Sequence, residues 1–280
     1  MLRQRVITAL ILLPMILGPI FWFPTPALFV FLSAVGLIAA WEWTALMGLT
    51  QMASRAAYLG LIALLLAGAG FLEVHFALGY AVLMVGALWW GMALSLVAGY
   101  PINFKYRPWG LVRFSLAGVV MIVPAVLGLA MLHGSLSGLE RPGYNGIARL
   151  FFMFAMVWMA DIGAYFAGRR FGKRKLAPDV SPGKTIEGAI GGFIASMSMV
   201  AAAPWVFGFG RFDWLPLLLL CALVVVASVI GDLTESLFKR HRGVKDSGTL
   251  LPGHGGILDR IDSVLAAAPV LALGLVLLGI

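Results

Sequence analysis

The chain has 280 residues, of which 61% are hydrophobic and 11% are charged. A soluble domain has roughly 45–50% apolar and about 25% charged residues, so this chain has too few polar side chains to cover a water-soluble globule. Disorder is excluded by the same composition, and a disulfide scaffold is excluded by the single cysteine, Cys221. The composition indicates an integral membrane protein. Its net charge of +8 has three possible explanations: binding of nucleic acid, contact with anionic lipid, or the topology of the protein in the membrane.

Nine apolar stretches are long enough to cross a bilayer as helices, which takes about 20 residues. In chain order they cover approximately 6–23, 27–46, 57–72, 77–98, 116–132, 150–167, 186–207, 215–233 and 263–280. Arg3 and Arg5 before the first stretch could indicate a signal peptide, but its length and the spans that follow favour a retained helix. We expect an all-α, polytopic membrane protein.

Lys and Arg residues in short loops predict the orientation, because cytoplasmic loops carry an excess of them. Of the 20 such residues, all but those at positions 141, 149 and 211 fall on the side of the N-terminus. This distribution places the N-terminus and two large basic loops, around 169–184 and 239–260, in the cytoplasm. Nucleic acid is then not needed to explain the net charge.

Polar residues are concentrated in the second half of the chain. Residues 1–148 are mostly apolar helices with few polar features, whereas the polar clusters follow residue 149. We therefore divide the chain into a transmembrane scaffold for lipid access over 1–148 and a catalytic region over 149–280.

The first polar cluster begins at Asp161, near the end of the sixth span, and continues to the start of the seventh. Within it, Gly183-Lys184-Thr185 suggests a P-loop. That motif needs a further glycine where Pro178 stands, and it needs a preceding strand, which we do not expect here. We therefore reject the P-loop interpretation.

An anion site of another kind fits the same residues. Ser181, Lys184 and Thr185 precede a helix, whose N-terminal N–H groups and dipole attract phosphate. We expect Ser181, Lys184 and Glu187 to act in this site. For the basic run at 169–175, a role in this site and a role limited to topology and contact with anionic lipid explain the sequence equally well.

The second polar cluster lies at the end of the eighth span. Four polar side chains occur there at i, i+3, i+4 and i+7, which places them on one face of a helix: Asp232, Glu235, Ser236 and Lys239. A carboxylate in a membrane helix costs roughly 2.5–3.5 kcal/mol at the bilayer centre. We therefore expect these residues to face a polar cavity that contains a partner.

Asp259 and Asp262 lie one turn apart at the start of the ninth span. One of them could simply complement the helix dipole, but two adjacent carboxylates repel unless a proton or a cation intervenes. Mg²⁺ typically binds one or two carboxylates together with substrate phosphate oxygens. We expect a Mg²⁺ site built by Asp232 and Asp259, while the glycines around His254 allow the backbone to approach a phosphate closely.

The stretch from Ser236 to Asp262 resembles the signature of a known family. It is written Ser-Leu-Phe-Lys-Arg-x4-Lys-Asp-x5-Pro-Gly-His-Gly-Gly-Ile-Leu-Asp-Arg-Ile-Asp, across 27 residues, and is similar to the signature of the phosphatidate cytidylyltransferases. Residues 161–172 and 181–188 resemble other parts of that family. Two positions depart from its pattern: Ile162 stands where a small hydroxyl residue is frequent, and Gly183 where Lys is frequent.

The resemblance implies the reaction CTP + phosphatidate → CDP-diacylglycerol + pyrophosphate, with Mg²⁺, at the cytoplasmic face of a bacterial inner membrane. It implies Asp232 and Asp259 as metal ligands, and we expect Lys184 and Lys239 to join them in catalysis. The residues expected to bind the substrates are Ser181, Thr185, Glu187, Ser236, Arg240, Lys245, Asp246, His254 and Arg260. A homodimer is expected from the family alone.

Two other functional classes remain open. A transporter for a phosphate-bearing solute would suit the intramembrane Asp161, Asp232 and Glu235, but it predicts charges near the bilayer midplane and paired broken helices. A lipid or prenol kinase would use a cation and a nucleotide similarly, but it does not explain the signature over 236–262. The grouping of charges at one membrane face favours an interfacial enzyme.

Overall fold

A computed structural model of the chain describes residues 14–72, 76–106, 109–134, 145–208, 213–251, 253 and 255–279. Within these residues, eight helical segments are long and apolar enough to cross a membrane. They are α2 (Thr25–Met47), α3 (Met52–Leu72), α4 (Phe76–Ala98), α6 (Leu111–His133), α7 (Gly146–Phe171), α8 to α9 (Ile186–Phe207), α10 (Trp214–His241) and α11 (Leu258–Leu278).

Each of these segments matches one predicted span, which confirms an all-α polytopic membrane protein. Residues 6–13 of the first predicted span lie outside the described residues, and its described part is helical over 14–22. A short helix that the hydropathy pattern does not predict, α5 (Ile102–Tyr106), connects α4 to the segment before α6.

Two helices extend beyond their apolar stretches into polar sequence. The helix α7 continues to Phe171 and α10 to His241, because helical hydrogen bonding does not end where hydrophobicity ends. The helical extension of α10 keeps Asp232, Glu235 and Lys239 in one helix, as the predicted spacing requires.

The seventh predicted span is interrupted near its end. It consists of α8 (Ile186–Ser198), a 3-10 turn (Met199–Ala202) and α9 (Ala203–Phe207). Pro204 lies in the first turn of α9, where the missing N–H of proline is tolerated.

The basic loop between α7 and α8 contains a β-hairpin, so the expectation that no strand precedes Lys184 is wrong. Strands β1 (Lys175–Ala177) and β2 (Ser181–Thr185) pair antiparallel. The strands are too short to show alternating hydrophobicity, and Pro178 and Pro182 suggest a turn instead. Pro178 still stands where a P-loop needs glycine, so the rejection of that motif is unchanged.

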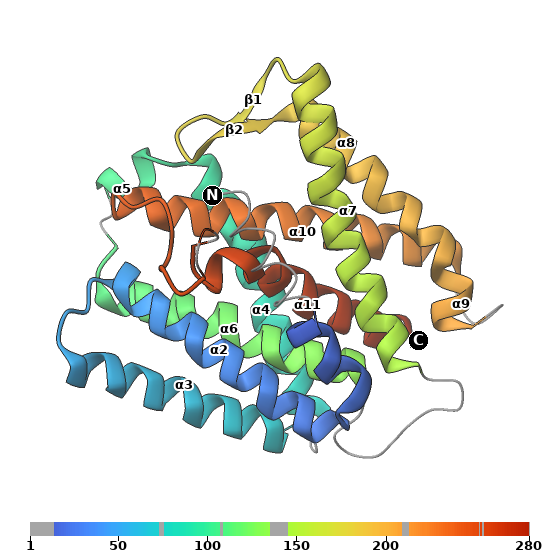
Figure 1. Cartoon of the computed structure of the whole chain (residues 1–280), viewed down its shortest axis with the longest axis horizontal. Helices are drawn as coiled ribbons and strands as arrows, with labels where there is room; N and C mark the ends of the chain where they lie inside the picture. Colours follow the sequence, from blue (N-terminus) through green and yellow to red (C-terminus); the bar gives the residue numbers. More distant parts are fainter. Residues whose placement is uncertain are drawn as a thin grey trace.

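The bundle packs around α6, which contacts α2, α4 and α11. Glycines bring these helices close: a Cβ on Gly86 of α4 would lie 2.6 Å from Pro124 Cβ of α6, and one on Gly128 would lie 3.0 Å from the backbone of Ala268 in α11. Small residues at helix contacts are typical of membrane bundles. Figure 1 shows α7 and α8 as a pair at one side of this bundle, with the hairpin at their tip.

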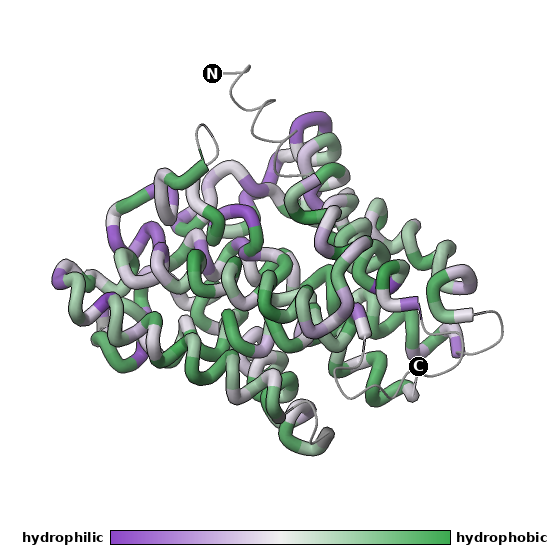
Figure 2. Tube along the Cα trace, turned by 60° about the horizontal axis from the view of Figure 1, so that its bottom comes forward, coloured by the Kyte–Doolittle hydropathy of each residue, from purple (hydrophilic) through white to green (hydrophobic). Residues whose placement is uncertain are grey.

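An aromatic cluster joins the two halves of the chain near the end of α10. The Trp43 indole of α2 donates to the Phe114 carbonyl of α6 at 2.9 Å, and its ring centroid lies 5.0 Å from that of Phe238 in α10. Trp43, Phe114 and Phe238 are all fully buried. The C-terminal end of α2 is therefore held beside the polar end of α10. Figure 2 shows that much of the hydrophilic sequence lies along one edge of a mostly hydrophobic molecule.

Candidate active site

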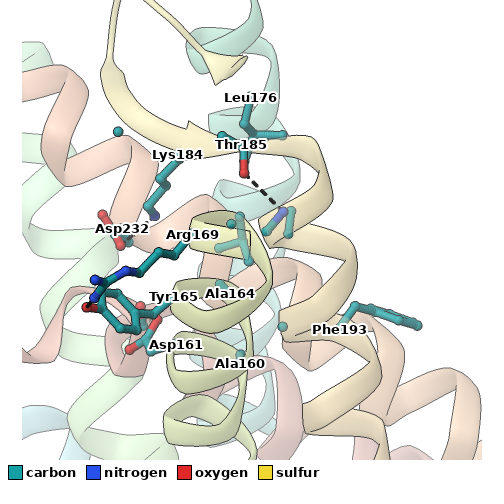
Figure 3. A pocket seen from close by; sticks show the side chains of 17 residues that line it. Ala160, Asp161, Ala164, Tyr165, Arg169, Leu176, Lys184, Thr185, Phe193 and Asp232 are labelled. Atoms are coloured by element: carbon teal, nitrogen blue, oxygen red, sulfur yellow. Dashed lines mark hydrogen bonds and ion pairs between the residues drawn. The ribbon is translucent and has the colours of Figure 1, made fainter. Parts of the chain in front are cut away.

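A cavity of about 390 Å³ lies between α7, β2, α8 and α10, where both polar clusters begin. Its charged and polar lining includes Asp161, Tyr165, Arg169, Lys184 and Asp232. In Figure 3, the side chains of Lys184, Asp232, Arg169 and Asp161 lie on the same side of α7, whereas Phe193 points away from them. The cavity therefore combines cations and carboxylates between helices that are otherwise apolar.

Lys184 and Asp232 form an ion pair in this cavity. The hairpin presents Lys184 from β2 while α10 presents Asp232, and the Lys184 Nζ–Asp232 Oδ2 distance is 2.5 Å. The Ser236 hydroxyl donates to Asp232 Oδ1 at 3.4 Å, one helical turn further along α10. The two charged side chains are 30% and 27% exposed, so a substrate can reach them.

Glycines let α7 and α8 approach each other beside the cavity. A Cβ on Gly163 would lie 2.5 Å from Ala195 Cβ, and one on Gly192 would lie 2.4 Å from the Ala160 carbonyl. Gly192 also lines the cavity. Because a larger side chain at these positions would push the helices apart, the glycines determine the width of the cavity.

Asp161, Tyr165 and Arg169 lie at i, i+4 and i+8 on α7 and therefore share one face. The Arg169 guanidinium donates to the Tyr165 hydroxyl at 2.9 Å. Asp161 interacts electrostatically with Asp232 and Lys184. The face of α7 toward the cavity thus adds one cation and one carboxylate to the Lys184–Asp232 pair.

A second ion cluster lies one turn further along α10. The Lys239 ammonium is 2.7 Å from Glu235 Oε2 and 2.5 Å from Asp259 Oδ1. The other oxygen of Asp259 accepts the N–H groups of Ser247 at 2.9 Å and Gly256 at 2.8 Å. Asp259 therefore binds Lys239 and also fixes the loop that precedes α11.

Asp262 connects the two clusters. It interacts electrostatically with Asp232, Lys184 and Lys239. A Cβ on Gly231 would lie 2.5 Å from the Asp262 carbonyl, so α10 and α11 are in close contact here. Together the clusters form one charged strip along the α10–α11 contact, in which the two lysines meet four carboxylates: Asp232, Glu235, Asp259 and Asp262.

Several predicted substrate-binding residues make contacts that hold the structure around the cavity. Glu187 Oε2 accepts the N–H groups of Lys173 and Arg174 at 3.0 and 3.1 Å, which closes the base of the hairpin. Thr185 lines the cavity and caps α8 through the N–H of Gly188. Arg240 donates to the carbonyls of Val180 and Val244, and so joins the hairpin to the loop after α10.

The remaining predicted residues lie at the edge of the site or outside the described residues. Lys245, Asp246 and Arg260 are exposed, and Arg260 interacts electrostatically with Asp161. Ser181 pairs with Ala177 in the hairpin. His254 lies outside the described residues.

Three acidic residues that contact this site in the structure are not among the residues predicted to act in it. Asp161 and Asp262 face the charged strip directly, and Glu42 binds the loop that Asp259 holds. All three are carboxylates at the ends of, or within, apolar stretches, where an unpaired charge is costly. That signal could have found each of them in the sequence.

Comparison with known proteins identifies the family. A family model described as the cytidylyltransferase family matches residues 3–278. A phosphatidate cytidylyltransferase from Pseudomonas aeruginosa is 45% identical over 272 residues, covering 97% of this chain and 96% of the relative. One from Haemophilus influenzae is 40% identical, covering 96% of each chain, and one from Brucella suis is 38% identical, covering 97% of this chain and 92% of the relative. The chain therefore belongs to the cytidylyltransferase family.

Proposed function

We propose that the chain transfers the cytidylyl group of CTP to phosphatidate, which gives CDP-diacylglycerol and pyrophosphate for phospholipid biosynthesis. The observation that carries the proposal is the Lys184–Asp232 pair in a cavity beside the Asp259–Lys239 cluster. These residues belong to the segments that resemble the family signature, and relatives alike over nearly the whole chain are named for this reaction.

The reaction needs positioning and charge compensation more than proton transfer. A phosphate oxygen of phosphatidate attacks the α-phosphorus of CTP in line, and pyrophosphate leaves. Phosphatidate is ionised near neutral pH, so no dedicated general base is required. Lys184 and Arg169 line the cavity, where cations offset the charge of the triphosphate and of the leaving group.

Mg²⁺ is the cofactor that the donor set fits. Carboxylate oxygens are its preferred protein ligands, and it usually keeps substrate oxygens or water in its other positions. Among the described residues, no group of three or more acidic, His or Cys side chains could hold a metal ion by itself, so the proposed cation would need substrate oxygens or water among its ligands. Bound there, Mg²⁺ would offset phosphate charge.

Asp232 and Asp259 are the residues proposed to hold the cation. Asp232 lines the cavity, and its Oδ1 atom has only a long contact with Ser236 in the described structure, at 3.4 Å. Both oxygens of Asp259 are already bound, by Lys239, Ser247 and Gly256. Asp259 would therefore have to exchange Lys239 for the cation.

We propose a bacterial inner membrane as the location, with the site at the cytoplasmic face and lipid reaching it from the bilayer. The positions of Lys and Arg support this orientation, and the relatives are bacterial. A homodimer stays a prediction. The transporter alternative is disfavoured because the charged side chains of α10 and α11 lie toward one end of each helix. In α10 they are Asp232, Glu235 and Lys239, toward His241, and in α11 they are Asp259 and Asp262, next to Leu258.

The test is an assay of the purified full-length protein with phosphatidate and CTP labelled in its α-phosphate, with and without Mg²⁺. We expect labelled lipid and pyrophosphate only when Mg²⁺ is present. Asp232→Ala should lower the rate by at least about a hundredfold, the usual loss when a key electrostatic group is removed. Asp179→Ala, at the exposed turn of the hairpin, is the control and should keep the wild-type rate.

Each alternative function gives a different result in this assay. A kinase would form no cytidylyl lipid, and a transporter would consume no nucleotide. Near-normal activity of Asp232→Ala would contradict the role assigned to that carboxylate while leaving the reaction itself supported.

A further inference from the structure

Glu42 is a buried carboxylate near the end of α2, and its side chain is bound by a loop distant in sequence. The residue is 5% exposed. Its carboxylate accepts the N–H of Ile257 at 3.0 Å and the N–H of Leu258 at 2.8 Å. It also accepts the hydroxyl of Ser247 at 3.1 Å. Two donors from the loop that precedes α11 and one from the first residue of α11 thus converge on one side chain of the N-terminal half.

Two glycines bring the loop close to the Glu42 carboxylate. A Cβ on Gly248 would lie 2.6 Å from a Glu42 oxygen, and one on Gly256 would lie 2.3 Å from the other. The neighbouring Trp43 is fully buried and packs on Phe238 of α10. The loop that contains Gly248 and Gly256 therefore packs tightly against the Glu42 carboxylate. The helix that carries Glu42, α2, is itself packed on α10.

Asp259 binds the same loop. It accepts the N–H of Ser247 and the N–H of Gly256, so the backbone of Ser247 is bound by Asp259 and its hydroxyl by Glu42. Glu42 also binds the N–H of Leu258, the residue immediately before Asp259. The position of the Asp259 carboxylate therefore depends on both ends of this hydrogen-bond network.

The start of the loop is anchored on α2 as well. The Arg242 guanidinium donates to the carbonyl of Leu46 and, at 2.5 Å, to that of Met47, at the C-terminal end of α2. Cations at this end of a helix are favoured by its exposed carbonyls and dipole. The loop from α10 to α11 is thus fastened to α2 at its beginning by Arg242 and at its end by Glu42.

We propose that Glu42 is a positioning residue for cytidylyl transfer, which acts by fixing the loop over 247–258 so that Asp259 stays paired with Lys239. The inference rests on the proposed function, because Asp259 is assigned to the reaction there. It gives the N-terminal half a role in the reaction in addition to that of scaffold.

The test compares Glu42→Gln with Thr44→Val in the purified full-length protein. Thr44 is a matched control because it is fully buried on the same helix, and its hydroxyl bonds Trp41 and Arg55 but not the loop. Glutamine keeps the shape of Glu42 but points an NH₂ donor at backbone donors. Measured quantities are kcat, the KM for CTP, the midpoint of thermal unfolding, and hydrogen exchange of residues 247–258.

Glu42→Gln should lower kcat by about ten- to a hundredfold, as small displacements of catalytic groups do, with little change in the KM for CTP. It should also speed hydrogen exchange over 247–258. Thr44→Val should keep the wild-type kcat and the wild-type rate of hydrogen exchange in that loop, even if its midpoint of thermal unfolding falls as much as that of Glu42→Gln. Ser247→Ala, which removes one donor to Glu42, should show a smaller loss of the same kind and replaces Glu42→Gln if that variant does not fold.

Wild-type kcat in Glu42→Gln and Ser247→Ala would overturn the proposal, as would an equal loss of kcat in Thr44→Val. Failure of the proposed function is separable from these outcomes. In that case the wild-type protein forms no cytidylyl lipid, and the exchange measurement alone decides whether Glu42 holds the loop.

Discussion

Lys184 is the cation that the hairpin delivers to Asp232, and the two groups form the most direct link between the two polar clusters. The side chain comes from β2, whereas its partner comes from α10, 48 residues later in the sequence. Both are partly exposed to the cavity. The pair can therefore open toward a substrate without breaking the packing of the bundle.

Lys184→Met should lower kcat for cytidylyl transfer by about a hundred- to a thousandfold, the loss expected when a preorganised electrostatic group is removed from a phosphoryl site. Lys184→Arg should recover part of that loss, since it restores the charge. Lys175→Met is the matched control: it lies on the same hairpin, is exposed, and donates only to the Pro182 carbonyl in the described structure. Kinetic assays with labelled CTP measure the kcat of all three variants. Equal rates for Lys184→Met and Lys175→Met would refute the role of Lys184.

Sequence patterns predict this pair better than they predict its surroundings. Lys184 and Asp232 stand out because charges are rare in apolar sequence, and the spacing from Asp232 to Lys239 is that of one helical face. Glu42 and Asp161 are equally rare charges, but their partners come from distant segments. Nothing local shows that Glu42 binds N–H groups more than 200 residues away, since that contact depends on how α2 packs against the end of α10.

The hairpin is an element beside the cavity that the sequence does not predict. Its strands have three and five residues, too few to show a period of two, and the pairing depends on Glu187 bonding two backbone N–H groups at its base. The long helices, by contrast, follow directly from apolar runs of spanning length. The carboxylate of Glu187, in the first turn of α8, thus stabilises a hairpin that the hydropathy pattern does not predict.

Glu187→Ala should loosen the hairpin and lower activity about tenfold, because Lys184 is then no longer held toward Asp232. The guanidinium of Arg174 also contacts Glu187, but the Arg174 side chain is 71% exposed, so this ion pair contributes little. The loss should come from the two backbone N–H groups. Limited trypsin digestion measures the change: cleavage around 173–175 should be faster in Glu187→Ala than in wild type and unchanged in Asp179→Ala. Equal digestion rates in all three proteins would show that Glu187 does not stabilise the hairpin.

At the scale of the whole molecule, the composition fixes the class, and the positions of the charges predict which face of the membrane carries the reaction. The eight described spans, the hairpin and the loop over 242–257 place the basic residues of the second half beside the cavity and the Asp259 cluster. The division at residue 148 stays a prediction. The contacts of Glu42 and Arg242 show that α2 nevertheless takes part in holding the segment between α10 and α11.

The orientation predicts which engineered cysteines are accessible from outside the cell. In a bacterial inner membrane, Asp179→Cys in the hairpin turn should react with a membrane-impermeant maleimide only after the membrane is opened. Asp213→Cys, exposed at the start of α10, should react in intact cells whose outer membrane alone is permeable. Cys221 is fully buried, so the wild-type protein gives the background. Because CTP is a cytoplasmic nucleotide and the cavity lies beside the hairpin, the reverse labelling pattern would contradict both the orientation and a cytoplasmic site. Labelling of Asp213→Cys alone in intact cells would place Lys184 and Asp232 on the side where CTP is present.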